Sequence, residues 1–340
     1  MYRRLILATA ALTFVLIVLG AYVRLSDAGL GCPDWPGCYG ELTPHHAADD
    51  IAQAEAAQPG GPVSVPKAWK EMVHRYLAGG VGMLILAIAF TAWRRRRELR
   101  QSPWLATVLV AVVGLQALFG KWTVTMLLKP AIVTGHLVGG MTTLALLVWL
   151  AMRQTGAGRA AVAASPGLRA AAALGFLLLA AQIVLGGWVS TNYAALACTD
   201  LPTCHGAWLP AMDFGNAFHL VRELGRTADG ALLPLDALTA IHWMHRVGAV
   251  IVLCYLIGLG LALTRHAGLS LSGRLLIFVV CLQFGLGLAN VAFSLPLPNA
   301  VAHNGGAAAL LALMVVINFK LSATPSVARS PGVLHESAAA

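Results

Sequence analysis

The sequence predicts an all-α polytopic membrane protein, with eight transmembrane helices forming two four-helix bundles related by a pseudo-twofold axis. Three observations support this: an apolar composition, apolar stretches separated by basic loops, and an internal repeat. Of the 340 residues, 58% are hydrophobic and 11% are charged, whereas an ordinary soluble domain carries about 25% charged residues. The composition excludes a soluble enzyme. We expect no nucleic-acid partner, because no soluble basic domain is evident.

Eight apolar stretches are long enough to cross a bilayer, which takes about 20 helical residues. The first follows Arg3 and Arg4 like a signal peptide, but no small-residue cleavage site follows it, so we expect a retained helix. The expected spans are Leu5–Val23, Val73–Trp93, Trp104–Trp122, Ala131–Met152, Leu168–Trp188, Leu238–Leu263, Leu271–Phe293 and Ala300–Leu321.

Basic residues gather on one side of these spans. Fourteen of the 23 Lys and Arg residues share a side with both termini, against two of the 14 acidic residues, Glu98 and Glu336. Short basic loops stay in the cytoplasm. We therefore expect a multi-pass protein of the inner (plasma) membrane, in contact with the lipid bilayer, with both termini cytoplasmic and the long loops 24–72 and 189–237 outside.

The second half of the chain repeats the first. Residues 21–38 align with 187–204, with seven of eighteen pairs identical. Four spans per half is an even number, so both halves enter the membrane from the same side. The predicted division is an N-terminal four-helix bundle, a cytoplasmic linker, a C-terminal four-helix bundle and a disordered cytoplasmic tail, at residues 1–152, 153–167, 168–321 and 322–340.

Four histidines occupy repeated positions near the outer ends of even-numbered spans: His74, His136, His245 and His303. Ionisable residues in a membrane are costly and are functional candidates by default. Two imidazoles per half, from two helices of one bundle, suit axial ligation of a heme iron. Zinc is the less expected metal, because it usually takes three or four nitrogen or sulfur ligands and no cysteine or carboxylate lies beside both histidines of a pair. The alternative is a helix-packing histidine bonded to a backbone carbonyl, which four repeated positions disfavour.

Charged neighbours of these histidines suggest a reactive half. Glu71 lies three residues before His74, on the same helical face, and could accept a proton or stabilise positive charge beside a macrocycle. His242 holds that position in the other half, which suggests that only the first half reacts. The alternative for Glu71 is a solvated interfacial carboxylate. Arg75 and Arg246 could pair with heme propionates or simply snorkel to the interface.

Four cysteines form two pairs in the outer loops, Cys32 with Cys38 and Cys198 with Cys204. An oxidising outer compartment permits disulfides there. Each would close a short loop and stabilise it. A redox role, or contact with a heme edge, is the alternative.

Taken together, these motifs resemble the heme A synthase family. The resemblance rests on the run from Gly20 to Cys38, Glu71-x-x-His74-Arg75, Gly135-His136, His242-x-x-His245-Arg246 and Ala302-His303. It implies a permanent heme b held by His245 and His303. It also implies substrate heme O held by His74 and His136, with Glu71 as the catalytic carboxylate.

The resemblance further implies oxidation of the C8 methyl of heme O to a formyl group, which yields heme A for terminal oxidases. Heme O synthase and an electron donor are the expected partners; oxidase assembly factors and a homo-oligomer are further candidates. From the residues alone, the leading alternative is a bis-histidine diheme cytochrome that transfers electrons from a quinol. A transporter would leave the repeated histidines unexplained, and the difference between Glu71 and His242 favours an enzyme over a symmetric electron carrier.

The charge distribution generates a topology prediction. Reporter fusions at Arg97 and at Asp229 should report opposite sides of the membrane, with Arg97 inside. The same side for both fusions would overturn the eight-span count.

Overall fold

The computed structural model describes residues 1–99, 101–154 and 164–322, and its regular elements there are helical. Eight helices are long and apolar enough to span a membrane, which confirms the predicted class and span count. They are α1 (Tyr2–Leu25), α3 (Val65–Arg94), α5 (Trp104–Thr125), α6 (Pro130–Gln154), α7 (Pro166–Thr191), α9 (Leu235–Thr264), α10 (Ser270–Ala292) and α11 (Leu297–Ser322). The short helices are α2 (Ala48–Ala57), α4 (Arg96–Leu99), η2 (Ala194–Leu196) and α8 (Phe214–Ala217).

The largest difference from the predicted bounds is at the start of α3. This helix begins at Val65 instead of Val73, with a proline in its first turn, where a missing N–H costs nothing. Hydropathy marks only the apolar part of a helix, and α3 continues through a polar turn that includes Glu71. Glu71 and His74 therefore lie inside a helix, with fixed spacing, and not at a fraying end.

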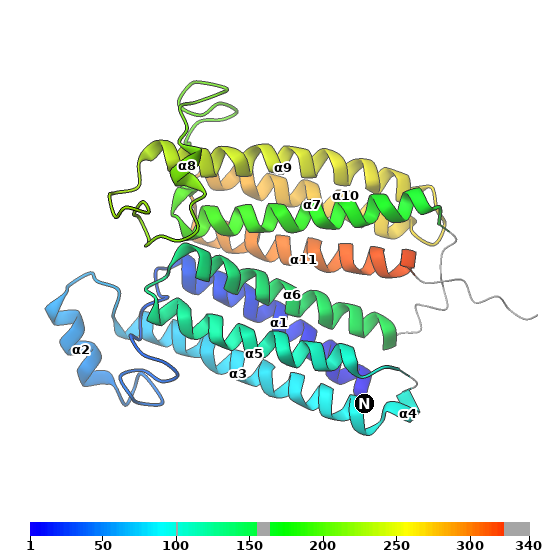
Figure 1. The fold of residues 1–340 in the computed structure, drawn as a ribbon, viewed down its shortest axis with the longest axis horizontal. Helices are drawn as coiled ribbons and strands as arrows, with labels where there is room; N and C mark the ends of the chain where they lie inside the picture. Colours follow the sequence, from blue (N-terminus) through cyan, green and yellow to red (C-terminus); the bar gives the residue numbers. More distant parts are fainter. Residues whose placement is uncertain (100, 155–163, 323–340) are drawn as a thin grey trace, which may run out of the picture.

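The spanning helices form two groups of four (Figure 1). In the first group α1 contacts α3 and α6, and α5 contacts the same two helices; in the second, α7 and α10 each contact both α9 and α11. The groups meet where α11 contacts α1 and α6, and where α6 contacts α7. The pseudo-twofold axis and the domain bounds stay predictions. Most of the predicted linker and all of the tail beyond 322 lie outside the described residues.

The two ends of the helices differ in what they carry. The long loops with α2 and α8 lie at one end, and the N-terminus and α4 lie at the other (Figure 1). The predicted charge pattern likewise puts the N-terminus and the basic loop 94–100 on one side and the two long loops on the other. Which end faces the cytoplasm stays a prediction.

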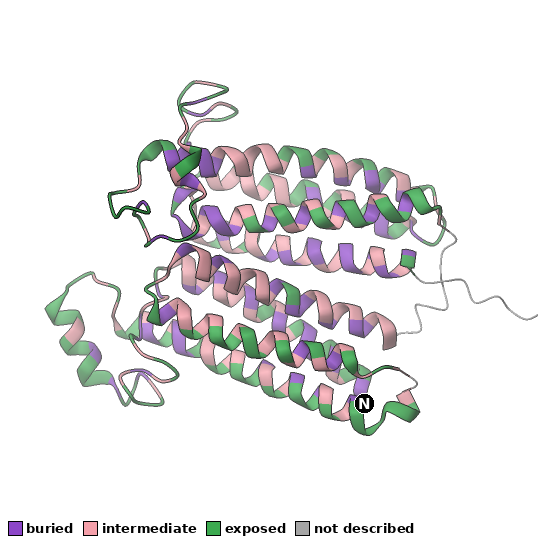
Figure 2. Cartoon of the chain, in the orientation of Figure 1, coloured by how far each residue is buried: buried purple, intermediate pink, exposed green. Residues whose placement is uncertain are grey.

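The largest buried apolar cluster joins the two halves. It contains Ile17 and Met141 from the first group and Leu179, Leu256 and Met314 from the second. Buried, half-buried and exposed residues alternate along the spanning helices (Figure 2). Large exposed apolar side chains such as those of Leu177 and Phe278 fit a surface in contact with lipid.

Helices α9 and α10 pack closely at two glycines. A Cβ on Gly273 would lie 2.5 Å from the carbonyl oxygen of Gly260, and a Cβ on Gly260 would lie 2.6 Å from Cγ1 of Ile277. Small residues permit this close approach between membrane helices.

We predict that Gly273→Ala destabilises the fold by about 1–3 kcal/mol, because the added methyl group meets backbone and not a movable side chain. Thermal unfolding in detergent measures the effect. The matched control is Gly258→Ala on α9, where an added Cβ meets no atom within 4 Å. Equal unfolding temperatures for both variants would contradict the close contact.

Candidate functional site

The structure places the four repeated histidines in two pairs. His74 on α3 and His136 on α6 belong to the first helix group, and His245 on α9 and His303 on α11 to the second. The imidazoles of each pair are close enough to interact electrostatically. All four residues are half-buried, so part of each remains accessible.

Each imidazole packs against a glycine of the preceding spanning helix. A Cβ on Gly20, Gly120, Gly186 or Gly287 would lie 2.9, 3.3, 3.0 or 3.1 Å from Cε1 of the facing histidine. Glycine permits this close approach, because a Cβ at these positions would crowd the ring. The glycines repeat in sequence, as the histidines do.

Glutamines tie three of the four histidine-bearing helices to their neighbours. The amides of Gln116, Gln182 and Gln283 donate to the main-chain carbonyls of His136, His245 and His303, at 2.5, 2.9 and 2.8 Å. Each amide lies over a glycine three residues after the histidine, namely Gly139, Gly248 and Gly306. Sequence reasoning missed these glutamines. The sequence does contain a signal for them: in three otherwise apolar helices, a glutamine lies four residues before the glycine that packs against a histidine.

The histidines have unused bonding capacity. Within the described ranges, Nδ1 of His74, His136 and His303 is buried without a hydrogen-bond partner. The same part of the chain contains no group of three or more His, Cys, Asp or Glu side chains able to hold a metal ion. Paired imidazoles without a third protein ligand suit a heme iron, which two histidines would hold, better than zinc.

Glu71 fastens the first long loop, which connects α1 to α3, to the helix α3. Its Oε2 accepts the backbone N–H of Cys32 at 2.9 Å, its Oε1 accepts from Arg75 at 2.5 Å, and the residue is 5% exposed. It is therefore not the solvated carboxylate weighed as an alternative. A buried carboxylate held by two donors keeps one orientation.

His242 occupies the same place in the second half. Its Nδ1 lies 3.2 Å from the backbone nitrogen of Cys198, and its Nε2 lies 3.2 Å from Nε of Arg246. A neutral imidazole has one acceptor nitrogen, so it can accept only one of these bonds, whereas the carboxylate of Glu71 accepts both. The two halves thus share a loop attachment but differ in charge.

The two arginines bind loop carbonyls. Arg75 donates to the carbonyls of Cys32, Asp34 and Gly37, at 3.3, 2.8 and 2.5 Å. Arg246 donates in the same way to Cys198, Asp200 and Thr203, at 2.7, 2.9 and 2.9 Å. Neither side chain simply snorkels. Contact with heme propionates stays a prediction, and it would require some of these bonds to be exchanged.

Both predicted disulfides are present in these loops. Cys32 pairs with Cys38 and Cys198 with Cys204, each with a Cα–Cα distance of 4.9 Å. In the second loop, the carboxylate of Asp200 accepts from the Thr203 hydroxyl and from the N–H groups of Gly206 and His205. These bonds hold the pKa of Asp200 well below its usual range, so its contribution to loop stability is complete above about pH 4 and is lost only in strong acid.

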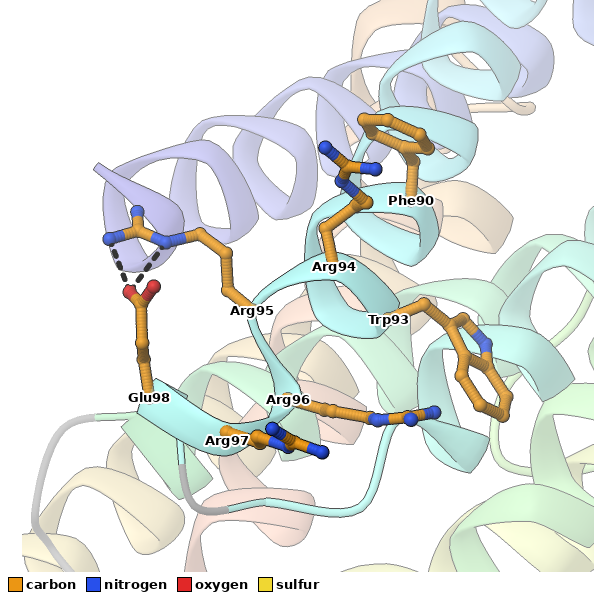
Figure 3. Close-up of a pocket in the computed structure, with 7 residues that line it drawn as sticks. All are labelled: Phe90, Trp93, Arg94, Arg95, Arg96, Arg97 and Glu98. Atoms are coloured by element: carbon orange, nitrogen blue, oxygen red, sulfur yellow. Dashed lines mark hydrogen bonds and ion pairs between the residues drawn. The ribbon is translucent and has the colours of Figure 1, made fainter.

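A separate hollow lies at the basic end of α3 (Figure 3). Phe90, Trp93 and residues 94–98 line a volume of about 860 Å³. It contains no histidine and is not part of the candidate heme site.

The fold and site define a class: a multi-pass helical membrane protein whose two halves each present a pair of histidines from neighbouring helices. Residues 3–315 match the COX15-CtaA family, described as cytochrome oxidase assembly protein. The chain belongs to this family.

Similar proteins carry the name heme A synthase. One from Shewanella oneidensis is 40% identical over 92% of this chain and 94% of its own length. One from Caulobacter sp. is 31% identical over 89% and 91%, and one from Bradyrhizobium diazoefficiens is 29% identical over 97% and 94%. The resemblance inferred from the motifs is confirmed.

The loop contacts predict that Arg75 protects the Cys32–Cys38 disulfide. Arg75→Leu should speed its reduction by dithiothreitol about tenfold, because losing even one hydrogen bond to a charged group costs about 1.5 kcal/mol. Alkylation and peptide mapping measure the rate. Cys198–Cys204 in the same chain is the internal control, and an unchanged rate for Cys32–Cys38 would contradict the attachment.

Proposed function

We propose that this chain is a heme A synthase, an oxidoreductase that converts the C8 methyl of heme O to a formyl group. Family membership and the names of its relatives support this function. The observation that carries the detailed proposal is the asymmetry between two otherwise repeated sites: a buried carboxylate, Glu71, precedes one histidine pair, and His242 takes its place before the other.

In the first half, His74 and His136 would hold the iron of substrate heme O. Glu71 lies three residues before His74, so both share one face of α3. Oxidising the methyl carbon removes protons and creates transient positive charge. A buried, fixed carboxylate stabilises such charge better than water does, and Arg75 and the Cys32 N–H keep it oriented.

In the second half, His245 and His303 would hold a permanent heme b. When bound, this heme supplies a one-electron redox centre. The residues of this half position it: Gly186 and Gly287 bring the helix backbones against the imidazole edges. Because His242 stands where Glu71 does in the first half, this half lacks the carboxylate at that position, and we expect its heme to remain unreacted.

The proposal includes a setting for the reaction. Both termini are cytoplasmic, so the histidine pairs lie toward the outer side of the membrane. Heme O synthase would supply the substrate, and the product would pass to oxidase assembly. The change from methyl to formyl removes four electrons from the carbon and adds one oxygen atom, so an oxidant of the dioxygen class is required. A separate donor would supply the electrons, and protons would be taken up as the remaining oxygen atoms are reduced to water.

The experiment that tests the function is extraction and chromatography of bound hemes after co-expression with heme O synthase. Heme A in the extract supports the proposal. Heme O alone, with intact disulfides and normal membrane insertion, would contradict it and would favour the bis-histidine cytochrome.

The permanent heme gives one prediction. His245→Ala and His303→Ala should each lose the low-spin b-type signal in the reduced-minus-oxidised spectrum, because one axial ligand is removed. Alanine at Leu282, which is exposed on α10, is the control. If both histidine variants keep the wild-type heme content and band positions, the ligand assignment is wrong.

Glu71 gives a prediction about the rate of the reaction. Glu71→Gln should lower the rate of heme A production by about 10²–10³, the usual effect of losing one well-placed electrostatic group, and Glu71→Asp should retain more activity than Gln. The ratio of heme A to heme O in membranes at equal protein level measures this.

Glu71→His separates charge from loop attachment, because it copies the contact seen at His242. We expect this variant to keep the Cys32–Cys38 disulfide protected while heme A production falls. Wild-type conversion by the Gln or His variant would show that the charge is not needed.

A further inference from the structure

Three of the four histidines accept, at their main-chain carbonyl, a hydrogen bond from a glutamine on the preceding spanning helix. We call this bond the glutamine tie, and His74 on α3 lacks it. Gln116, Gln182 and Gln283 each lie four residues before the glycine that faces a histidine. The equivalent residue on α1, four before Gly20, is Leu16. Leucine has no donor, so the carbonyl of His74 receives no side-chain bond from this position.

The partner glycine is missing from the same pair. Gly139, Gly248 and Gly306 make room for the amides, three residues after their histidines. Leu77 stands three residues after His74. The glutamine and the glycine of the tie are thus both replaced by leucine in the same helix pair. This is also the pair that carries Glu71.

The tie restrains the position of a ligand. Its hydrogen bond joins the neighbouring helix to the main chain of the histidine itself, which fixes the Cα from which the imidazole projects. In the second half both histidines, His245 and His303, are tied. In the first half His136 is tied and His74 is not.

We propose that His74 is the releasable heme ligand, and that Gln182 with Gly248 is the positioning pair that makes the second heme permanent. The inference rests on the proposed function, in which the first half must accept one heme and release another. Absence of the tie lets α3 shift against α1, so that His74 leaves the iron while His136 stays in place.

The test is the rate of heme transfer from the purified holoprotein to excess apomyoglobin. Heme A and heme O report on the first half and heme b on the second, and their spectra distinguish them. Gln182→Leu should speed heme b release about fivefold, the effect of about one hydrogen bond. Leu16→Gln with Leu77→Gly should slow heme A release by a similar factor, and Leu77→Gly alone should not slow it.

Unchanged release in both Gln182→Leu and the Leu16→Gln/Leu77→Gly variant, with wild-type unfolding temperatures, would overturn the inference. The outcome is independent of turnover. If the extract contains heme O but never heme A, the proposed function fails, while a difference in release between the halves still supports a releasable His74.

A second, independent feature is the arginine hollow of Figure 3. Arg95 is paired with Glu98 at 2.6 Å, but in the described ranges no carboxylate is paired with Arg94, Arg96 or Arg97. Arg94 lies over the Phe90 ring and Arg96 over the Trp93 ring, with the guanidinium carbon 5.9 and 5.7 Å from the ring centroids. Arg96 and Arg97 lie close together and Arg94 points toward Phe90 (Figure 3), so three exposed guanidinium groups give this end of α3 a strong positive charge.

We infer that this hollow binds the phosphate of an anionic phospholipid. It lies at the end of a spanning helix, where lipid headgroups are expected, and clustered arginines there attract anionic lipids by about 1 kcal/mol each. Guanidinium groups also match phosphate oxygens in geometry. The exposed Phe90 would lie against the acyl chain.

Native mass spectrometry of protein extracted from phosphatidylglycerol nanodiscs tests the site. The wild type should retain phosphatidylglycerol, and Arg94→Gln/Arg96→Gln/Arg97→Gln should lose it. Arg3→Gln/Arg4→Gln, which removes charge at the same end of the molecule, should not. Equal retention by the triple variant would overturn the inference, as would equal stabilisation by inorganic phosphate alone or by phosphatidylcholine.

Discussion

Close contact between a histidine ring and a glycine backbone is the constraint on which the rest of this structure depends. In a bilayer, helices gain little from burying apolar surface against each other, so their spacing depends on close packing and hydrogen bonds. Gly20, Gly120, Gly186 and Gly287 each accept an imidazole edge. A side chain at any of them would crowd the facing imidazole, so the ring or the helix would have to shift.

The two disulfide-bearing loops extend this arrangement beyond the membrane helices. Arg75 and Arg246 gather loop carbonyls, and Glu71 and His242 reach the backbone nitrogen of the first cysteine in each disulfide. Glu71 therefore combines two roles in our proposal. The loop fixes its carboxylate, and the fixed carboxylate then faces the substrate. Its chemistry and its structural contacts have to be separated by experiment, since both act through the same oxygens.

Much of the fold was predictable because hydropathy and charge are local properties. All eight spans, both disulfides and the family resemblance followed from composition, spacing and the repeat. The start of α3 was misplaced, because a helix continues through polar residues that hydropathy does not count. The partners of Arg75 were also missed, because its bonds reach residues 38 to 43 positions away in the chain.

The sequence by itself determined the helix count, the sorting of charge between the two ends, and the recurrence of histidine and cysteine. The tertiary structure alone decided that Glu71 holds a loop and that three glutamines, Gln116, Gln182 and Gln283, bond the main chain of a histidine on the neighbouring helix. The physical reason is that spacing along one helix shows which residues share its face. Only the rotation and distance of the neighbouring helix show what that face meets.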